Sequence, residues 1–197
     1  MIIGLTGTYC SGKNHVSALL EKRGFPSLDV DKLGYEALEL EKEAVFTRFG
    51  GDLRKADGSI DRRALGQRVF GRAEELAALE AIVHPPVNRM VDDWIKTTPS
   101  PTGCYVVNAA LLHRAEVFHR LGCIILVSAP LITRLFRAKR RDRLPWKAIF
   151  KRFSSQKNFY SQYLSINAEI YRIENPVFAK PENRINEIIE KISRRRN

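Results

Sequence analysis

The chain has 197 residues, of which 44% are hydrophobic, and this suits one compact globular domain with room for an inserted subdomain. Its longest apolar stretches, such as 123–127, are far shorter than the roughly 18 to 20 residues that a membrane-spanning helix needs. Because Met1 leads directly into a predicted strand without a signal-peptide pattern, we expect a cytoplasmic protein with no membrane partner.

Short apolar segments alternate with helical patterns along the chain. The first segment, 2–6, is followed by a glycine-bracketed loop and then by a helical pattern that stops at Gly24. This alternation predicts an α/β fold with a parallel five-stranded sheet and helices on both faces. The predicted strands are 2–6, 25–31, 104–107, 123–129 and 169–173.

Residues 32–98 carry a mostly helical pattern, which we interpret as an inserted subdomain. The pattern is interrupted at 49–61, where paired glycines and an Asp-Gly dipeptide are turn signals. A proline-rich connector at 97–103 returns the chain to the sheet, and an amphipathic helix is predicted from Pro181 onward. The organisation expected is therefore one domain, 1–197, with a helical insertion.

The segment GTYCSGKN at 7–14 differs in one letter from a phosphate-binding loop, G-x-x-x-x-G-K-[ST]. It follows a strand and opens a helix, which is the context that such a loop requires, although an ordinary glycine-rich turn is the alternative. We therefore expect a P-loop NTPase-type fold that binds nucleotide phosphates, with Lys13 reaching the outer phosphates. The residues predicted to bind ATP here are Gly7, Thr8, Tyr9, Cys10, Ser11, Gly12, Lys13 and Asn14.

Asn14 stands where the pattern has a hydroxyl that normally reaches magnesium. Its amide oxygen is a possible magnesium ligand, but the side chain is longer than that of serine and a weaker partner for the ion. Asn14 is therefore the candidate metal ligand, and the sequence leaves open how the protein binds magnesium.

The net charge of +11 favours an anionic partner: nucleic acid, an anionic membrane surface or a phosphate-rich small substrate. Charge alone does not choose among these partners. Cys10, Cys104 and Cys123 lack the spacing of a disulfide framework or a zinc site, so we expect reduced thiols.

Several further motifs follow the loop. They are DVDK at 29–32, FGGDLRKADGSIDRRAL at 49–65, VF at 69–70, HP at 84–85, LL at 111–112, the arginine-rich stretch 134–143, and Asn175. In this order and at these spacings they resemble the dephospho-CoA kinase family, which phosphorylates the ribose 3′-hydroxyl of dephospho-CoA with ATP. The resemblance covers nearly the whole chain.

Phosphoryl transfer to a hydroxyl needs a carboxylate that orients or deprotonates the acceptor. Asp31 matches the second acid of the family's DxD motif, so the resemblance makes it the candidate catalytic base. Asp29, expected two residues earlier on the same strand face, is the alternative base or a helper at the substrate or metal. A pair of this kind can also serve only as a helix N-cap.

Residues 131–158 are predicted to form a basic lid, since 134–152 contain nine basic residues and one acid. Arg137 and Arg141, four residues apart, share one helical face and match lid arginines of the family. A guanidinium over the γ-phosphate would stabilise charge in the transition state. A solvated charged face and an RNA-binding stripe are the alternatives.

The resemblance also assigns residues to the two substrates. Asp61, Arg62 and His84 match acceptor-side motifs and are expected to line the dephospho-CoA pocket, although His84 before Pro85 could equally be a helix-ending core histidine. Asn175 matches an asparagine near the adenine of ATP, although before Pro176 it could be an ordinary turn residue.

Besides Asn14, three positions depart from the family pattern. Asn108 stands where an acid is usual, Ala110 replaces a proline and Arg114 stands where a glutamate is usual. The expected activity is ATP- and magnesium-dependent phosphorylation of dephospho-CoA by a monomer, with no nucleic-acid partner. The alternatives are another small P-loop nucleoside or nucleotide kinase, a weakly active nucleotide-binding relative, or a non-enzymatic nucleic-acid binder.

Overall fold

The structure, a computed structural model, describes residues 1–156, 159–163, 168–176 and 181–196. The chain forms two compact units. The first unit combines Met1–Leu28 with Thr98–Asn197, and the second is the intervening segment Asp29–Thr97. Within the described residues, no helix is both long and apolar enough to cross a membrane.

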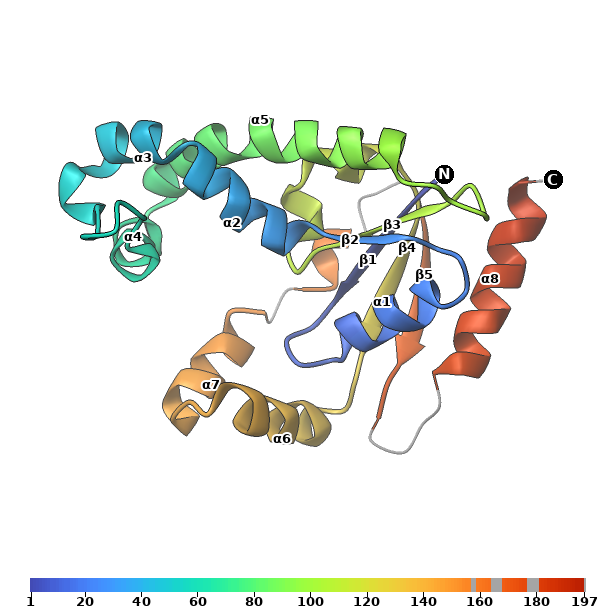
Figure 1. Cartoon of the computed structure of the whole chain (residues 1–197). Coiled ribbons are helices and arrows are strands. Elements are labelled where there is room, and N and C mark those ends of the chain that lie inside the picture. The colour runs from blue at the N-terminus through green and yellow to red at the C-terminus, as the bar shows by residue number, and fades with distance from the viewer. Residues whose placement is uncertain (157–158, 164–167, 177–180, 197) are drawn as a thin grey trace. The chain divides into compact units, whose positions relative to one another are not determined.

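A five-stranded sheet lies at the centre of the first unit (Figure 1). Its strand order is β2-β3-β1-β4-β5, and β1 pairs in parallel with β3 and β4. All five predicted strands are present, so the predicted parallel α/β fold is confirmed. The strands are β1 (Ile2–Gly7), β2 (Ser27–Asp29), β3 (Tyr105–Asn108), β4 (Leu121–Ser128) and β5 (Glu169–Glu174).

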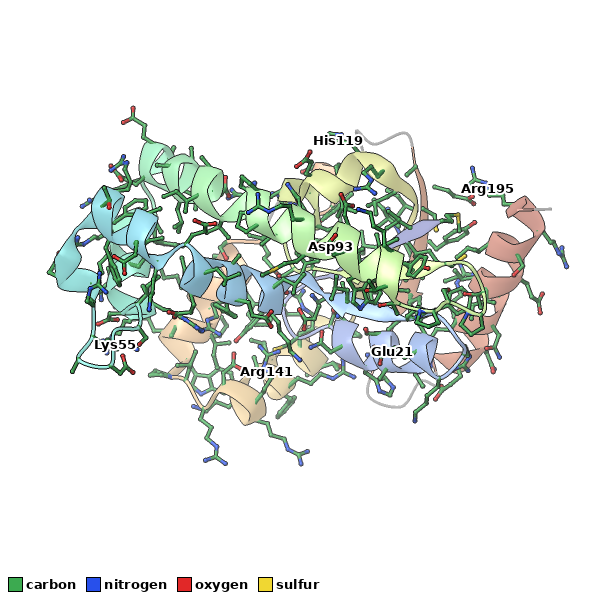
Figure 2. All side chains as sticks on the ribbon, turned by 45° about the horizontal axis from the view of Figure 1, so that its top comes forward. Glu21, Lys55, Asp93, His119, Arg141 and Arg195 are labelled. Carbon is green, nitrogen blue, oxygen red and sulfur yellow. The ribbon has the colours of Figure 1, made fainter. Side chains whose placement is uncertain are left out.

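Two helices cover one face of this sheet, α1 (Lys13–Glu21) and α8 (Glu182–Arg196) (Figure 1). Their apolar residues form a core with Ile3 and Leu5 of β1, because alternate residues of a strand point to the same face. Figure 2 shows Arg195 near the end of α8, and its guanidinium pairs with Glu169 of β5 at 2.8 Å. The helix residues buried in this core are Val16, Leu19, Leu20, Ile185, Ile188 and Ile192.

The other face of the sheet is covered by short 3₁₀ helices. They are η2 (Leu112–Arg114), η3 (Glu116–Arg120) and η4 (Ser161–Tyr163). Contact here is close at Gly4, where an added Cβ would lie 2.6 Å from Leu112 and 2.7 Å from Leu121. The fully buried Tyr163 lies 3.3 Å from the hydroxyl of Thr6. The sheet is therefore buried on both faces, which explains its nearly continuous apolar strands.

Helices α6 (Leu131–Asp142) and α7 (Trp146–Ser154) follow β4 and form a basic helix pair. Their mutual contact buries Ala138 and Ile149 completely. Arg143, in the left-handed conformation with φ 53°, ends α6, and Pro145 precedes α7. These helices lie within the predicted lid; Lys157 and Asn158, also assigned to it, lie outside the described residues.

The second unit is helical and has its own apolar core. The helical pattern is interrupted near the predicted position, where Gly50 has φ 109° and Gly58 has φ 78°. Its elements are α2 (Val30–Leu40), α3 (Lys42–Phe49), η1 (Gly51–Leu53), α4 (Arg62–Val69) and α5 (Ala73–Thr97). The core consists of Leu38, Val45, Phe46, Phe49, Leu53, Ile60, Leu65 and Val69.

The expectation that Asp29 and Asp31 share one strand face is wrong. Strand β2 ends at Asp29, which takes the N-cap position of α2, and Asp31 lies in the first turn of that helix. Aspartate is favoured at both positions, because it suits the N-cap backbone and the positive end of the helix dipole. The side chain of Asp29 nevertheless makes no capping hydrogen bond.

The alternative interpretation of His84 as a helix-ending core residue is also wrong. Helix α5 continues through Pro85 and Pro86 to Thr97, and His84 is half-buried in its middle. Each proline removes one backbone hydrogen bond, so packing must compensate, and Pro86, Val87 and Val91 are indeed buried. A Pro-Pro pair predicts a break from sequence, but tertiary burial overrides it.

We expect Ile188→Ala to lower the free energy of unfolding by about 2 to 5 kcal/mol, because it leaves a cavity in the core between α8 and the sheet. Ile188 is completely buried, whereas Ile189 next to it is only partly buried. Urea unfolding should therefore show a clearly smaller loss for Ile189→Ala. Equal losses in the two variants would contradict the assignment of α8 to this core.

Candidate functional site

The loop between β1 and α1 curls through two left-handed residues. Cys10 has φ 61° and Gly12, at the N-cap of α1, has φ 93°. The Ser11 N–H donates to the Thr8 carbonyl at 2.9 Å, and the Thr8 N–H donates to Val127 at the end of β4. At Gly7 an added Cβ would lie 2.6 Å from the Val127 oxygen, so only glycine fits. This conformation and the helix N-terminus together suit an anion.

Three buried oxygens at this end of the sheet have no hydrogen-bond partner among the described residues. They are the Thr8 and Ser11 hydroxyl oxygens in the loop and Oδ1 of Asn108 at the end of β3. Buried polar atoms in native proteins are nearly always paired, because leaving one unpaired costs about 1 to 3 kcal/mol. A polar ligand or water at the loop would satisfy them.

The Ser11 carbonyl is held from two sides. Arg137 Nη1 of α6 donates to it at 3.0 Å, and Asn175 Nδ2, just after β5, donates at 2.9 Å. The Asn175 backbone N–H donates to Ser128 at the end of β4, and the residue is only 4% exposed. Asn175 is therefore a buried support of the loop and not an ordinary turn residue.

The basic helix pair contacts the loop backbone at a second residue, Tyr9. Arg134 Nε donates to the Tyr9 carbonyl at 2.9 Å, and the Tyr9 N–H donates to Oε1 of Gln156 at 2.6 Å. An open cavity of about 430 Å³ lies between the loop and α6. Figure 2 shows Arg141, one of its lining residues, on the basic helix pair. The lining residues are Cys10, Gly12, Arg137, Arg140 and Arg141.

The electrostatics of this cavity are cationic. Burial raises the pKa of the Cys10 thiol, so the thiol stays protonated at neutral pH and adds no negative charge. Burial lowers the pKa of Arg134, but an arginine remains charged at any physiological pH. A multiply charged anion such as a triphosphate suits this combination of backbone N–H groups and guanidinium groups.

Two of the unusual residues are paired with each other. Asn108 Nδ2 donates to Oδ1 of Asn14 at 3.3 Å, which joins the start of α1 to the end of β3. The amide oxygen that the sequence offers to magnesium is thus already engaged. In the described part of the chain there is no cluster of three or more His, Cys, Asp or Glu side chains that could hold a metal ion. Two neutral amide oxygens suit a magnesium ion only if it keeps most of its ligands from water and from the phosphates.

The second unit carries a separate open groove of about 440 Å³. Arg62 lies in it, with Nη2 3.3 Å from Glu39 and its guanidinium 4.7 Å from the ring centroid of Tyr35. The groove therefore offers an aromatic ring beside one cation and its acidic partner. Its lining residues are Tyr35, Glu36, Glu39, Leu40, Arg62 and Met90.

The other predicted residues of the second unit have different environments. Asp61 caps α4, with Oδ1 accepting from the Arg63 and Ala64 N–H groups at 3.0 Å. These backbone hydrogen bonds, mainly that from Ala64, lower the pKa of Asp61. Among the described residues, Asp61 and His84 do not line the groove. Asp31 is exposed, whereas Oδ1 of Asp29 is buried without a hydrogen-bond partner among the described residues.

Sequence reasoning missed several contributors to these sites. Arg134 could have been found, since it precedes Arg137 by one helical turn on the same face. Tyr35 and Glu39 are likewise one turn apart on α2. No local pattern marks Gln156, because its contact with the loop spans 147 positions of the sequence.

Comparison with known proteins gives one consistent result. A sequence profile of the family described as "Dephospho-CoA kinase" matches residues 1–167. A dephospho-CoA kinase of Treponema denticola is 34% identical over 183 residues, which cover 89% of this chain and 82% of the relative. The crystal structure of TT1252 from Thermus thermophilus has a TM-score of 0.80 at 29% identity, covering 98% of this chain and 95% of that chain. Dephospho-CoA kinase from Campylobacter jejuni has a TM-score of 0.58 at 25% identity, covering 98% and 97%.

We expect Gly12→Ala to weaken ATP binding at least about tenfold, because alanine is strained at positive φ and loss of the Asn175–Ser11 bond adds about 1 kcal/mol. The new Cβ would lie 2.2 Å from Asn175 Nδ2. Gly66→Ala in α4 is the control, since its Cβ would meet nothing within 4 Å. Calorimetric titration with ATP should separate the two variants. Unchanged affinity in Gly12→Ala would show that the loop does not hold the phosphates.

Proposed function

Because the chain belongs to the dephospho-CoA kinase family, we propose that it transfers the γ-phosphoryl group of ATP to the ribose 3′-hydroxyl of dephospho-CoA. The products are coenzyme A and ADP. The observation that carries the proposal is the curled loop at Gly7–Asn14, bordered by arginines of the basic helix pair. A kinase needs such a cationic phosphate site, and phosphoryl transfer depends mainly on positioning and charge stabilisation.

On the donor side, the loop N–H groups and the N-terminus of α1 bind the phosphates of ATP, and Lys13 reaches the outer ones. The hydroxyl oxygens of Thr8 and Ser11 are buried in the loop and have no hydrogen-bond partner among the described residues. This supports polar contacts between these hydroxyl groups and ATP. Asn175, beneath the loop at the end of β5, is assigned to the adenine side of ATP. The loop already has the conformation that binds phosphate, so its backbone needs little reorganisation when ATP binds.

On the acceptor side, we assign Asp31 as the carboxylate that takes the proton of the 3′-hydroxyl. Asp31 follows the carboxyl end of β2, the edge at which open parallel sheets bind their ligands. Its exposure leaves room for a substrate hydroxyl. Asp29 has a buried oxygen without a protein partner in the described residues, which supports a role as a second contact to the acceptor.

The charge that spreads over the transferring phosphoryl group is stabilised by Arg141 and Arg137. Both line the cavity beside Gly12, so their positive charge is directed at the phosphate site. Interactions that strengthen as this charge develops raise kcat more than they lower KM. This is the role that an arginine finger has in other phosphoryl transferases.

The groove of the second unit is assigned to dephospho-CoA, with Arg62 and Tyr35 as its main contacts. A guanidinium suits the pyrophosphate of this substrate, and an aromatic ring suits its adenine or pantetheine portion. Asp61 supports this site as the cap that starts α4 directly before Arg62. His84 remains assigned to the acceptor on family resemblance.

Magnesium belongs to the same proposal, with Asn14 and Asn108 as its contacts from the protein. When bound with ATP, the ion neutralises phosphate charge and orients the γ-phosphate. Because the amide pair offers only neutral oxygens, the loop binds the phosphates by its N–H groups and Lys13 and contributes little to metal affinity. We further propose that the chain acts as a monomer in the cytoplasm.

The proposal is tested by measuring ADP formation with dephospho-CoA against a panel of adenosine, AMP and shikimate. We expect turnover with dephospho-CoA and little with the others. Lys13→Ala, as the control, should abolish turnover and weaken ATP binding, because a charged hydrogen bond to phosphate contributes about 1.5 to 3 kcal/mol. If one of the other compounds were phosphorylated faster than dephospho-CoA, that compound would be assigned as the substrate and the proposal would be wrong.

We expect Asp31→Asn to lower kcat by about 10² to 10⁴, the usual effect of removing a positioned general base. The affinity for ATP should change only a few fold, because the asparagine keeps the size of the side chain. Asp29→Asn is the matched comparison and should be milder. If Asp29→Asn causes the larger loss, the roles of the two carboxylates must be exchanged.

We expect Asn14→Ser to lower the half-saturating magnesium concentration severalfold, since one better ligand at a solvated site contributes about 1 kcal/mol. ATP affinity measured without metal should stay nearly constant, because the N–H groups and Lys13 are unchanged. Binding of a fluorescent ATP analogue during a magnesium titration gives this readout without turnover. An unchanged magnesium dependence would show that the asparagine pair already serves the ion.

A further inference from the structure

Asp142, the one acid among the nine bases of 134–152, lies at the centre of a charged network. Its Oδ1 accepts from Arg141 Nε at 2.7 Å, and its Oδ2 accepts from Arg152 Nη1 at 2.9 Å and from Arg141 Nη2 at 3.3 Å. The hydroxyl of Tyr9 in the nucleotide loop also donates to Oδ2. The carboxylate thus joins α6, α7 and the loop. The hydrogen bond from Arg141 is the main cause that lowers the pKa of Asp142.

The contact between Arg141 and Asp142 depends on residues outside helix α6 that hold the Asp142 carboxylate in place. The two residues are sequence neighbours at the end of α6, and neighbours on a helix do not face each other. The Asp142 side chain is 14% exposed, whereas that of Arg141 is 61% exposed. The donors that keep the carboxylate in this buried position come from Tyr9 and Arg152. Arg141 is therefore oriented by a carboxylate that the loop itself helps to hold.

The ring of Tyr9 adds to the same network. The guanidinium carbon of Arg141 lies 5.3 Å from the ring centroid and that of Arg152 lies 5.5 Å away. Phe153 meets the ring edge-on at 5.4 Å. Both cations lie within the distance at which cation–π attraction acts. Burial raises the pKa of Tyr9, so its hydroxyl keeps its proton at neutral pH and remains a donor.

These contacts leave one end of Arg141 available. Its Nε and Nη2 donate to Asp142, and Nη1 makes no hydrogen bond within the described part of the chain. Arg141 also lines the cavity beside Gly12. A guanidinium anchored at one end and available at the other is prearranged for an anion, because binding then costs less side-chain entropy.

We propose that Tyr9 is a positioning residue for Arg141: its hydroxyl holds the Asp142 carboxylate, which fixes the guanidinium beside the phosphate site. Tyr9 acts through Asp142 and touches no reacting atom with this hydroxyl. This inference rests on the proposed phosphoryl transfer, in which Arg141 stabilises the transferring group. Loss of the hydroxyl leaves Arg141 present but less well ordered.

The test is Tyr9→Phe, which keeps the ring and the backbone contacts to Arg134 and Gln156 while removing the hydroxyl. We expect kcat for dephospho-CoA to fall about tenfold, with the two KM values changed less than about threefold, because Arg141 acts mainly in the transition state. Tyr105→Phe is the control, since it removes the hydrogen bond that the hydroxyl of Tyr105 on β3 donates to the Thr98 carbonyl. Its kcat should match the wild-type value.

The decisive comparison uses the Arg141→Ala background. There Tyr9→Phe should lower kcat by less than about twofold, because the residue that Tyr9 positions is gone. An equal fractional loss in both backgrounds, or a wild-type kcat in Tyr9→Phe, would overturn the proposal. A merely structural role would produce the equal losses.

A second readout does not depend on turnover. Phenylglyoxal modifies accessible guanidinium groups, and mass spectrometry of peptides reports the rate at each arginine. We expect Arg141 to react severalfold faster in Tyr9→Phe than in the wild type, while the rate at exposed Arg143 stays constant. If the wild type shows no kinase activity, the proposed function fails, and this rate still decides the Tyr9 proposal. An unchanged rate at Arg141 would overturn it.

Discussion

The bonds to the Ser11 carbonyl are the constraint on which the rest of the site depends. Arg137 and Asn175 both donate to this oxygen, one from the basic helix pair and one from the end of β5. Together they hold the curled loop in place, and they bring α6 beside the start of α1. The cationic cavity is a consequence of this arrangement, because Arg137 and Arg141 share a helical face.

The paired amides of Asn14 and Asn108 join two of the four departures from the family pattern in one hydrogen bond. The family resemblance has a hydroxyl and an acid at these two positions, and this chain has two neutral amides there. The two side chains hydrogen-bond across 94 positions of the sequence. The pair is neutral, so it keeps the loop joined to β3 while reducing the attraction for a cation. The two positions that depart from the pattern at this site therefore form one hydrogen-bonded pair.

Local sequence was sufficient for the strands and the loop, because alternating apolar residues and bracketing glycines act over a few positions. It was insufficient where tertiary contacts decide the outcome. The strand expected through Asp31 ends at Asp29, where the helix N-terminus favours the acids. Helix α5 continues through the Pro-Pro pair, where the burial of Pro86 and Val87 compensates the lost hydrogen bonds. The Tyr9–Asp142 contact could not be inferred, since nothing local relates residues 133 positions apart.

The central claim is that this loop, with asparagine in place of the hydroxyl, supports phosphoryl transfer to a ribose hydroxyl. Phosphorus NMR of a mixture of ATP, magnesium, dephospho-CoA and the protein tests it most directly. The account predicts a new phosphomonoester signal, coupled to the ribose 3′ proton, that grows at the same rate as ADP. Growth of inorganic phosphate with ADP, or bound ATP that stays intact, would contradict it.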